Sequence, residues 1–463
     1  MTDSATSTTS RTSAAEARFD RKLIGPMVLG SILNPINSSI IAVSLVPIGR
    51  AFGAPTSQTA WLVSGLYLAT AIGQPVVGRL VDLFGPRRLL LAGAVLTGIA
   101  GLVGTFAPDL AVLVIARVIL GFGTCAGYPA SMSLIRTEAK RTGLASPSGV
   151  LATLTIAGQT IAVIGPTLGG LLIGLGGWRT TLAVNIPLAI ASFTVAAIFL
   201  PRDRKAAAPR AGANLDLIGI ALFAATLVSL LLFLMEPGVS QLYLLAITAV
   251  AAALLARREL RTAEPFLDLR LLGGNLPLLA TYARMLLTMT VSYGVLYGYT
   301  QWLEDSRGLT AAQAGLMLVP MFVVGIAASA ISGRRAEIRA KLVVGVCAQL
   351  VGCVLLLTLN GGSAIVLLVV IALVFGLPQG LNSLANQNAV YYQADTARLA
   401  SSSGLLRTFT YLGAIVASAL NGAFFGATAS TSGLHDIAVF LVAASALLLV
   451  LVLVDRSLRK TPR

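Results

Sequence analysis

Long apolar segments alternate with short polar ones along almost the whole chain. Because a bilayer span needs about 20 mainly apolar residues, this pattern predicts about fourteen transmembrane helices in groups of six, two and six. The first group is Leu23–Ile48, Thr59–Val77, Leu89–Ala107, Leu110–Ile135, Val150–Leu175 and Thr180–Leu200. After a basic segment, Pro201–Ala213, come Leu217–Met235 and the shorter Leu242–Ala256. A charged segment, Arg257–Arg270, precedes the last group, which is Leu276–Leu303, Ala311–Ser332, Leu342–Leu359, Ala364–Tyr392, Ser403–Ala429 and Ile437–Val454.

Composition agrees with a membrane protein. Hydrophobic residues make up 56% of the chain and charged residues 11%, with a mean hydropathy of +0.87. Soluble domains carry about 25% charged residues, so most of this surface must face lipid or other apolar helices. The alternating ten-residue segments of a membrane β-barrel are not seen. The predicted fold class is an all-α polytopic protein of a bacterial inner or plasma membrane, in contact with the lipid bilayer.

The basic residues predict the orientation of the chain. With the N-terminus inside, the outer loops hold little beyond Arg50, Arg179 and Arg307, whereas the inner loops and tails hold most other Lys and Arg residues. This asymmetry predicts cytoplasmic N- and C-termini. It also explains the net charge of +15 without a nucleic-acid partner.

The same order predicts five regions, with the two halves related by duplication. The regions are a disordered cytoplasmic tail over 1–20, a six-helix bundle over 21–201, a linker region with two extra helices over 202–275, a second six-helix bundle over 276–455, and a cytoplasmic tail over 456–463. The basic loop Ser332–Glu337 aligns with Gly78–Asp82, which places Glu337 where Asp82 sits. Transporters built from repeats bind their substrate at the interface between the halves.

One loop carries a specific motif. It reads Gly78-Arg79-Leu80-Val81-Asp82-Leu83-Phe84-Gly85-Pro86-Arg87-Arg88 and resembles the loop between helices 2 and 3 of the major facilitator superfamily, G-x-x-x-D-x-x-G-x-[R/K]-[R/K]. The resemblance implies a major facilitator fold and alternating access. Gly78 and Gly85 allow tight turns and close helix approach, and Asp82 either caps the following helix or pairs with a basic residue across the bundle interface. We expect these residues, with Arg87, Arg88 and Glu337, to form a conformational latch; the alternative is a solvated turn.

A second motif lies in the fifth predicted span. Residues Gly158–Gly170 contain Gly165-Pro166-Thr167-Leu168-Gly169-Gly170 and resemble the antiporter motif g-x-x-x-G-P-x-x-G-G, with Ile161 at a place where that family often has glycine. Gly-Pro kinks a membrane helix, and small residues let a neighbour pack closely. The following Gly177-Trp178-Arg179 and Asn185-Ile186-Pro187 resemble the 14-helix drug:proton antiporter branch. This resemblance implies proton-coupled drug efflux.

Arg117 is a basic residue inside the fourth predicted span. An arginine there costs about 2.5–3.5 kcal/mol on insertion scales unless it meets a cavity or a partner. Helical spacing places it on one face with Gly121, Thr124 and Tyr128. The family's fourth helix carries R-x-x-x-G-x-G, matched here by Arg117, Gly121 and Gly123, and the resemblance implies a role in proton transfer or substrate contact. The alternative is a structural hydrogen bond to backbone carbonyls.

The first helix departs from that branch. Its usual pattern is L-D-x-T-I-V-x-x-A-L-P, whereas this chain has Ser38 at the acidic place, near Asn34 and Asn37. No Asp or Glu lies in the middle of the first six predicted spans. The usual counter-charge for cationic drugs is therefore missing from this helix.

The second half offers further polar positions inside predicted spans. Arg284 shares a helix face with Thr288, Ser292 and Tyr299, and the opposite face carries Tyr293, Tyr297 and Gln301. Either face can line the cavity. Gln379, Asn382, Ser383 and Asn386 form a polar stripe that faces either a cavity or another helix. With Gln159 of the fifth span, these positions complete the substrate and coupling candidates: Asn34, Asn37, Ser38, Arg117, Tyr128, Gln159, Arg284, Tyr293, Tyr297, Gln379, Asn382 and Asn386.

Together these observations predict a monomeric secondary active exporter of amphipathic small molecules, coupled to protons. The alternatives are a lipid or anionic-amphiphile exporter, a flippase or a facilitator without proton coupling. An enzyme is not expected, and neither a metal nor a cofactor, because Cys125, Cys347 and Cys353 lie inside apolar runs and the single histidine, His435, lies in a loop. The motif G-x-x-x-x-G-K-[ST] is absent, so ATP is not expected to supply the energy. Glu304, Asp305 and Asp82 are the candidate proton sites that remain.

Overall fold

The described part of the chain is built from helices and contains no strand. The structure, a computed structural model, describes residues 19–459 except 55, 60, 143–147, 203–215, 236–237, 263–264, 267–268, 310, 334–336 and 426–428. Most of the tail expected over 1–20, the basic segment and the last four residues lie outside the described residues. The described residues include a short part of each predicted tail. Asp20 is held in place by its backbone N–H, which donates to Glu138 (2.8 Å), and the C-terminal tail begins with the helix η4 (Arg456–Arg459), in which Leu458 is buried.

The N-terminal bundle follows the first group of apolar segments. It consists of η1 (Arg21–Leu23), α1 (Ile24–Phe52), α2 (Thr56–Thr59), α3 (Trp61–Phe84), α4 (Pro86–Thr105), α5 (Leu110–Thr124), α6 (Gly127–Thr142), α7 (Ser148–Gly176), α8 (Thr180–Ala183) and α9 (Asn185–Phe199). Helices α5 and α6 share the fourth predicted span. They are separated at Cys125, near the point where Gly127 meets the backbone of Gly30 in α1 too closely for any Cβ.

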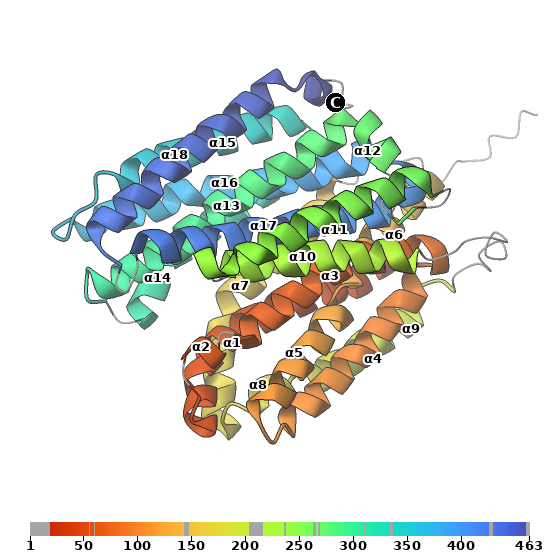
Figure 1. The fold of residues 1–463 in the computed structure, drawn as a ribbon, viewed down its shortest axis with the longest axis horizontal. Helices are drawn as coiled ribbons and strands as arrows, with labels where there is room; N and C mark the ends of the chain where they lie inside the picture. Colours follow the sequence, from red (N-terminus) through yellow and green to blue (C-terminus); the bar gives the residue numbers. More distant parts are fainter. Residues whose placement is uncertain are drawn as a thin grey trace, which may run out of the picture.

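The C-terminal bundle follows the last group. It consists of α12 (Leu269–Gly274), α13 (Leu276–Asp305), α14 (Ala311–Ser332), α15 (Ile338–Leu356), α16 (Ile365–Gln393), η3 (Thr396–Arg398), α17 (Leu399–Phe425) and α18 (Thr431–Val454). In Figure 1 these helices, coloured green to blue, lie mostly above the red to yellow helices of the N-terminal bundle.

The two extra helices are α10 (Leu217–Met235) and α11 (Leu242–Arg261), with η2 (Val239–Gln241) between them. They pack against each other, and α10 also contacts α3 and α17, so the pair lies along the seam between the bundles (Figure 1). Helix α11 is longer than its apolar run because Arg257 to Arg261 extend it by more than a turn.

Within the described residues, twelve helical segments are long and apolar enough to cross a membrane, and thirteen if the bent helix α7 counts as one span. Helix α13 is the longest at 30 residues but is not among them. Fourteen spans and cytoplasmic termini therefore stay predictions. The kink expected from Gly-Pro in α7 is confirmed, because the segments Gly149–Gly165 and Leu168–Gly176 meet at 44°.

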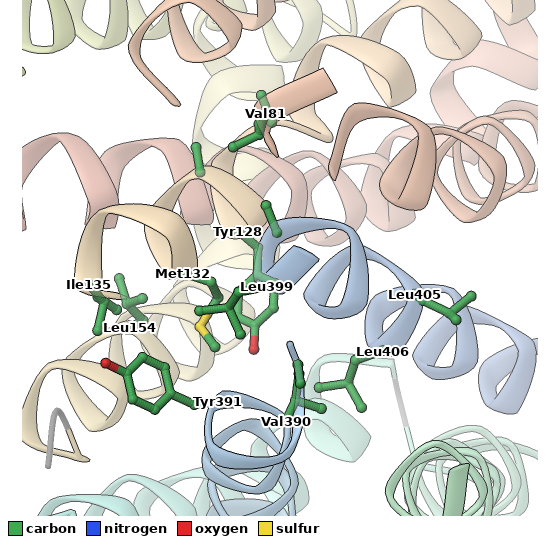
Figure 2. Packing of buried hydrophobic residues seen from close by; sticks show 14 of the residues in the cluster. Val81, Tyr128, Met132, Ile135, Leu154, Val390, Tyr391, Leu399, Leu405 and Leu406 are labelled. Carbon is green, nitrogen blue, oxygen red and sulfur yellow. The ribbon is translucent and has the colours of Figure 1, made fainter. Parts of the chain in front are cut away.

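The bundles meet over a continuous apolar core at one end of the molecule. Val81, Met132 and Ile135 of the N-terminal bundle share this core with Val390 and Leu406 of the C-terminal bundle (Figure 2). The same end holds Asp82, Asp20 and Asp455, and we call it the inner end. Burial of this apolar surface favours the closed arrangement of the bundles at the inner end.

Candidate functional site

At the inner end, Asp82 joins the two bundles. Its carboxylate accepts the backbone N–H groups of Ala400 (3.1 Å) and Ser401 (2.9 Å), at the start of α17. The first N–H groups of a helix lack partners within it and carry partial positive charge, so an anion there is stabilising. A Cβ at Gly78 would lie 2.6 Å from the Ala400 carbonyl oxygen. Glycine thus permits the approach that Asp82 then fixes.

This geometry corrects the expected partners of Asp82. The following helix, α4, takes no side-chain cap, because Gly85 turns the chain at φ 91° and Pro86 supplies a first residue that lacks an N–H. Nor does Asp82 pair with a basic residue across the interface among the described residues; its partner there is the backbone at the start of α17.

The other residues of the predicted latch have different surroundings. Arg87 donates to the Ala197 carbonyl of α9 (3.0 Å), inside its own bundle, and Arg88 is exposed. Glu337 is exposed at the start of α15, where its side chain makes no cap hydrogen bond. Instead, the loop that follows α14 repeats the close approach between the bundles. Gly333, directly after α14, packs against Ala152 of α7, as Gly78 packs against α17.

Further hydrogen bonds join the bundles between the inner end and the middle. Pro75 removes the N–H that would otherwise bond the Ala71 carbonyl, and Thr408 of α17 donates its hydroxyl to that oxygen (2.8 Å). Gln159 donates to the Gln379 carbonyl (3.1 Å), and Gln387 donates to Thr155 (3.3 Å). Each bond pairs an N-terminal with a C-terminal helix, so these contacts hold the bundles in register.

Five tyrosines gather where the bundles meet in the middle. We call them the tyrosine cluster: Tyr67 of α3, Tyr128 of α6, Tyr293 and Tyr297 of α13, and Tyr411 of α17. Ring centroids lie 5.7 Å apart for Tyr67 and Tyr411 and 5.6 Å apart for Tyr293 and Tyr297. Tyr67 also lies close to Tyr297, Ser38 and Arg117. Aromatic faces with hydroxyl tips can hold an apolar molecule and orient its polar groups.

Asn34 links this cluster to the N-terminal bundle. The Tyr411 hydroxyl donates to Asn34 Oδ1 across the interface (2.9 Å), while Asn34 Nδ2 donates to Thr70 (3.3 Å) and Thr124 (3.0 Å). Asn37, one turn further along α1, points elsewhere and donates to Asn185 Oδ1 of α9 (2.7 Å). Asn34 is thus hydrogen-bonded to the tyrosine cluster, whereas the Asn37 side chain bonds residues of its own bundle.

Arg117 is buried beside the tyrosine cluster, with 1% of its surface exposed. Its Nε donates to the Leu62 carbonyl (2.9 Å), and Nη1 and Nη2 both donate to the Asn37 carbonyl (3.4 Å each). These acceptors bring α5 together with α3 and α1. These bonds match the alternative given for Arg117 above, a structural hydrogen bond to backbone carbonyls.

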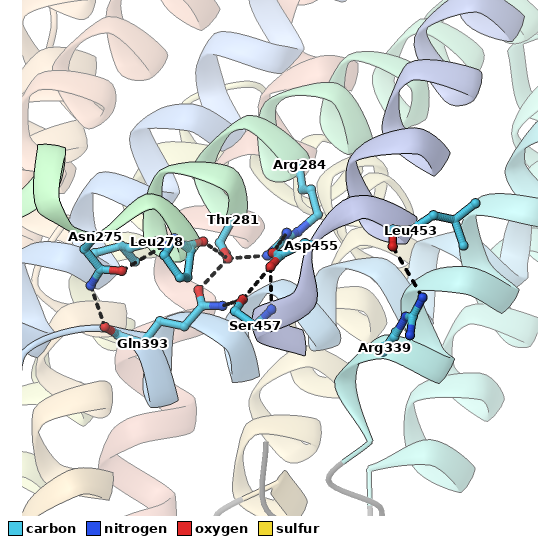
Figure 3. A network of polar contacts seen from close by, with 10 residues as sticks. Asn275, Leu278, Thr281, Arg284, Arg339, Gln393, Leu453, Asp455 and Ser457 are labelled. Atoms are coloured by element: carbon cyan, nitrogen blue, oxygen red, sulfur yellow. Dashed lines mark hydrogen bonds and ion pairs between the residues drawn. The ribbon is translucent and has the colours of Figure 1, made fainter. Parts of the chain in front are cut away.

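Arg284 lies away from the tyrosine cluster, which corrects its expected place in the substrate site. Its Nη1 pairs with Asp455 Oδ2 (2.5 Å) at the inner end, and the side chains are 0% and 10% exposed. Thr281, Gln393 and Ser457 complete the network (Figure 3). Burial raises the pKa of Asp455, but hydrogen bonds from Ser457 and Arg284 outweigh it and leave the pKa below its ordinary value. The Tyr293 and Tyr297 face of α13 is the one that meets the other bundle.

The polar stripe of α16 is mainly internal to the C-terminal bundle. Asn382 donates to Gln349 of α15 (3.3 Å), and Asn386 is fully buried with no hydrogen-bond partner for its amide among the described residues. Gln379 borders a small cavity with Ser292 and Gln349. Of the antiporter motif, Gly165 packs against Ser39 of α1, Gly169 is buried and Gly170 is exposed, while the Pro166 side chain lies outside the described residues.

Three residues of the central site escaped the sequence analysis: Tyr67, Arg407 and Tyr411. The Arg407 guanidinium lies over the Tyr128 ring, 4.0 Å from its centroid. Arginine inside the span Leu399–Phe425 was a visible signal for Arg407, by the reasoning applied to Arg117. Nothing comparable marks the two tyrosines. Among the described residues, no three His, Cys, Asp or Glu side chains gather as a metal site would require.

Two helix bundles that enclose a polar and aromatic site define a membrane transporter of the repeat type. The sequence profile of the Major Facilitator Superfamily matches residues 27–418, and the chain belongs to that family. It is 31% identical over 448 residues to the uncharacterized MFS-type transporter YwoD of Bacillus subtilis, covering 93% of this chain and 96% of the relative. It is also 31% identical over 340 residues to the Multidrug resistance protein B homolog of Mycobacterium tuberculosis, covering 69% of this chain and 59% of that protein.

The fold has relatives among solved structures. The human organic anion transporter MFSD10 superposes with a TM-score of 0.67 at 14% sequence identity, covering 92% of this chain and 99% of that chain. At this identity the likeness concerns the fold alone. The protein is thus a multi-span membrane transporter of the major facilitator type, and some of its relatives are named for drug resistance.

Proposed function

We propose that this protein is a secondary active exporter that moves amphipathic small molecules by alternating access of its two bundles. The observation that carries the proposal is the tyrosine cluster, in which both bundles supply polar and aromatic groups to one buried place. A molecule bound there contacts both halves, so its binding is coupled to their movement. The relatives named for multidrug resistance support export as the direction.

Protons are the driving ions in this proposal. ATP is not, because the chain has no phosphate-binding loop motif. Carboxylates of the described membrane helices lie near helix ends, as Asp82 does at the inner end and Asp305 at the outer end of α13. Asp305 accepts the Ala429 N–H (2.9 Å). Protonation of Asp82 would weaken its contacts with the start of α17, and protonation of Asp305 would weaken its contact with Ala429. Either proton would act at a distance from the substrate.

The test is substrate-dependent proton movement in proteoliposomes. Purified protein receives cationic dyes, anionic amphiphiles or neutral drugs under an imposed pH gradient, while an internal dye reports pH. We expect substrate accumulation that collapses when an ionophore removes the gradient. Transport of none of the three classes would refute the exporter, and transport without proton movement would refute the antiport.

One observation favours a second candidate, an exporter or facilitator of anionic amphiphiles without proton coupling. The middle of the interface holds two arginines, Arg117 and Arg407, and neither contacts a carboxylate within the described part of the chain. Such surroundings favour an anion over a cationic drug. Movement of an anionic amphiphile with no change of internal pH would select this candidate.

A further inference from the structure

Arg407 differs from Arg117 and Arg284, two other arginines that lie within or beside long helices. Arg117 bonds backbone carbonyls through Nε and both Nη atoms, and Arg284 pairs with Asp455. Arg407 is half-buried on α17, and none of its N–H groups has a hydrogen-bond acceptor among the described residues. The Arg407 guanidinium lies over the Tyr128 ring at 4.0 Å, and a cation–π contact consumes no N–H donor. Arg407 therefore keeps its donor capacity.

A second group at the same place is also incomplete. The Tyr128 hydroxyl is buried, the residue being 4% exposed, and it has no hydrogen-bond partner among the described residues. Buried hydroxyl groups are nearly always bonded, because an unmet bond is costly. Tyr128 comes from the N-terminal bundle and Arg407 from the C-terminal bundle. The two unsatisfied groups thus belong to one pair of side chains in contact across the interface between the bundles.

The surroundings of Arg407 specify the chemistry that would complete this site. Tyr293 and Tyr411 lie within range of an electrostatic interaction with Arg407. In the described regions, no carboxylate pairs with the Arg407 guanidinium. A guanidinium presents its N–H groups as a planar fork that matches a carboxylate or a similar oxyanion. The tyrosine rings next to it offer aromatic surface. The site lacks the negative charge that a cationic substrate would need.

We propose that Arg407 is the residue that recognises the transported substrate, and that this substrate is an aromatic organic anion. Its anionic group bonds the Arg407 guanidinium and the Tyr128 hydroxyl, and its ring system lies among the tyrosines of both bundles. This inference rests on the proposed transport function and narrows it to one charge class. It also assigns different tasks to the arginines, because Arg117 holds three helices together whereas Arg407 meets the substrate.

The test uses three probes of one shape and different charge: naphthoate, naphthamide and naphthylmethylammonium. Binding to the purified full chain is followed by tryptophan fluorescence, and uptake is followed in proteoliposomes. Wild type is expected to bind naphthoate at least about tenfold more tightly than the cation. Arg407→Gln is expected to weaken naphthoate binding about 10- to 100-fold and to leave naphthamide within about twofold, because one charged hydrogen-bonded contact is lost. Arg407→Lys keeps the charge but not the fork and should give an intermediate value.

Arg179→Gln is the matched control, because Arg179 also lies over an aromatic ring, that of Trp178 (4.3 Å), but at the outer end of the N-terminal bundle. It should leave the preference for naphthoate unchanged. Size-exclusion profiles and naphthamide binding establish that each variant is folded.

Three outcomes would overturn the inference: preference for the cation, no binding of naphthoate up to millimolar concentration, or an unchanged preference in Arg407→Gln. If one of these outcomes occurs and wild type nevertheless transports the amide or the ammonium probe, the inference fails while the exporter proposal survives. If no probe of any charge is transported, the exporter proposal fails as well.

Discussion

Replacing Asp82 with alanine is expected to loosen the inner end without unfolding either bundle. The substitution removes the carboxylate that accepts the N–H groups of Ala400 and Ser401, and both groups belong to the opposite bundle. Because this contact exists only while α3 lies against α17, its loss acts on the closed state. The open state, in which water would reach those N–H groups, is affected little.

The magnitude follows from the two effects of a capping carboxylate. Loss of a side-chain cap costs about 0.5–2 kcal/mol, and loss of a negative charge at a helix N-terminus costs about 0.3–1 kcal/mol. Together they shift the balance between closed and open inner ends by about 1–3 kcal/mol, or about 5- to 150-fold. Asp82→Asn keeps one acceptor oxygen and should show a smaller shift.

The assay measures the distance between spin labels on the two bundles. Lys140→Cys on α6 and Thr396→Cys in η3 supply exposed sites at the inner end, in a chain whose three native cysteines have been replaced. Asp82→Ala should add or enlarge a population at longer distance. Asp109→Ala is the control, because Asp109 caps α5 within the N-terminal bundle by accepting the Val112 N–H (2.9 Å). It should lower thermal stability without changing the distances. A distance distribution unchanged by Asp82→Ala would refute the reasoning.

Three other predictions concern packing and charge. Gly404→Val should hinder closure of the inner end and reduce transport by more than tenfold, because the valine side chain would clash with the backbone at Gln74 and Pro75. Uptake is measured with variant protein whose thermal stability matches that of wild type, and an unchanged uptake would contradict the prediction. Asp455→Asn should lower stability by about 3 kcal/mol at pH 7, since it leaves Arg284 buried without its partner. Because the pKa of Asp455 is held below its ordinary value, the stabilisation from this carboxylate is fully present above the unfolded pKa of about 4 and is lost as the pH falls through the lower folded pKa. The unfolding temperatures of wild type and Asp455→Asn should therefore converge in acid, below about pH 4. A difference in unfolding temperature that widens in acid would contradict this expectation. Arg117→Lys should lower the unfolding temperature, because a lysine cannot bond both Leu62 and Asn37 as the guanidinium does; unchanged stability would show that these bonds are not structural.

Much of the fold could be predicted from hydropathy, because lipid requires long apolar helices whatever their neighbours are. The kink of α7 could also be predicted, since Gly165 and Pro166 act on the local backbone. The hydropathy pattern is weaker where a helix faces protein on most sides. Helix α13 carries Arg284 and several tyrosines; the apolar run Leu276–Leu303 predicted it, but its mean hydropathy is too low for it to count among the twelve span candidates.

Partners distant in the sequence could not be predicted. Arg284 and Asp455 lie 171 positions apart, and Tyr411 and Asn34 lie 377 apart. Which side chains meet depends on the rotation of each helix and on how the bundles dock, and a single sequence encodes neither in a local pattern. Helical periodicity correctly separated two faces of α13, but only packing decides that the Tyr293 face meets the other bundle. For the same reason the prediction for Asp82 named two plausible kinds of hydrogen-bond donor, the following helix or a basic residue, but missed the N–H groups at the start of α17.

The most direct test of alternating access compares both ends of the molecule in one experiment. One spin-label pair sits at the inner end, Lys140→Cys with Thr396→Cys, and a second at the opposite end, Pro108→Cys with Thr358→Cys, all at exposed positions. Distances are recorded in lipid for the wild-type site and for Asp82→Ala. Alternating access predicts opposite changes: the fraction of molecules in which the outer distance shortens should equal the fraction in which the inner distance lengthens. An outer distance that stays constant or lengthens while the inner end opens would contradict alternating access.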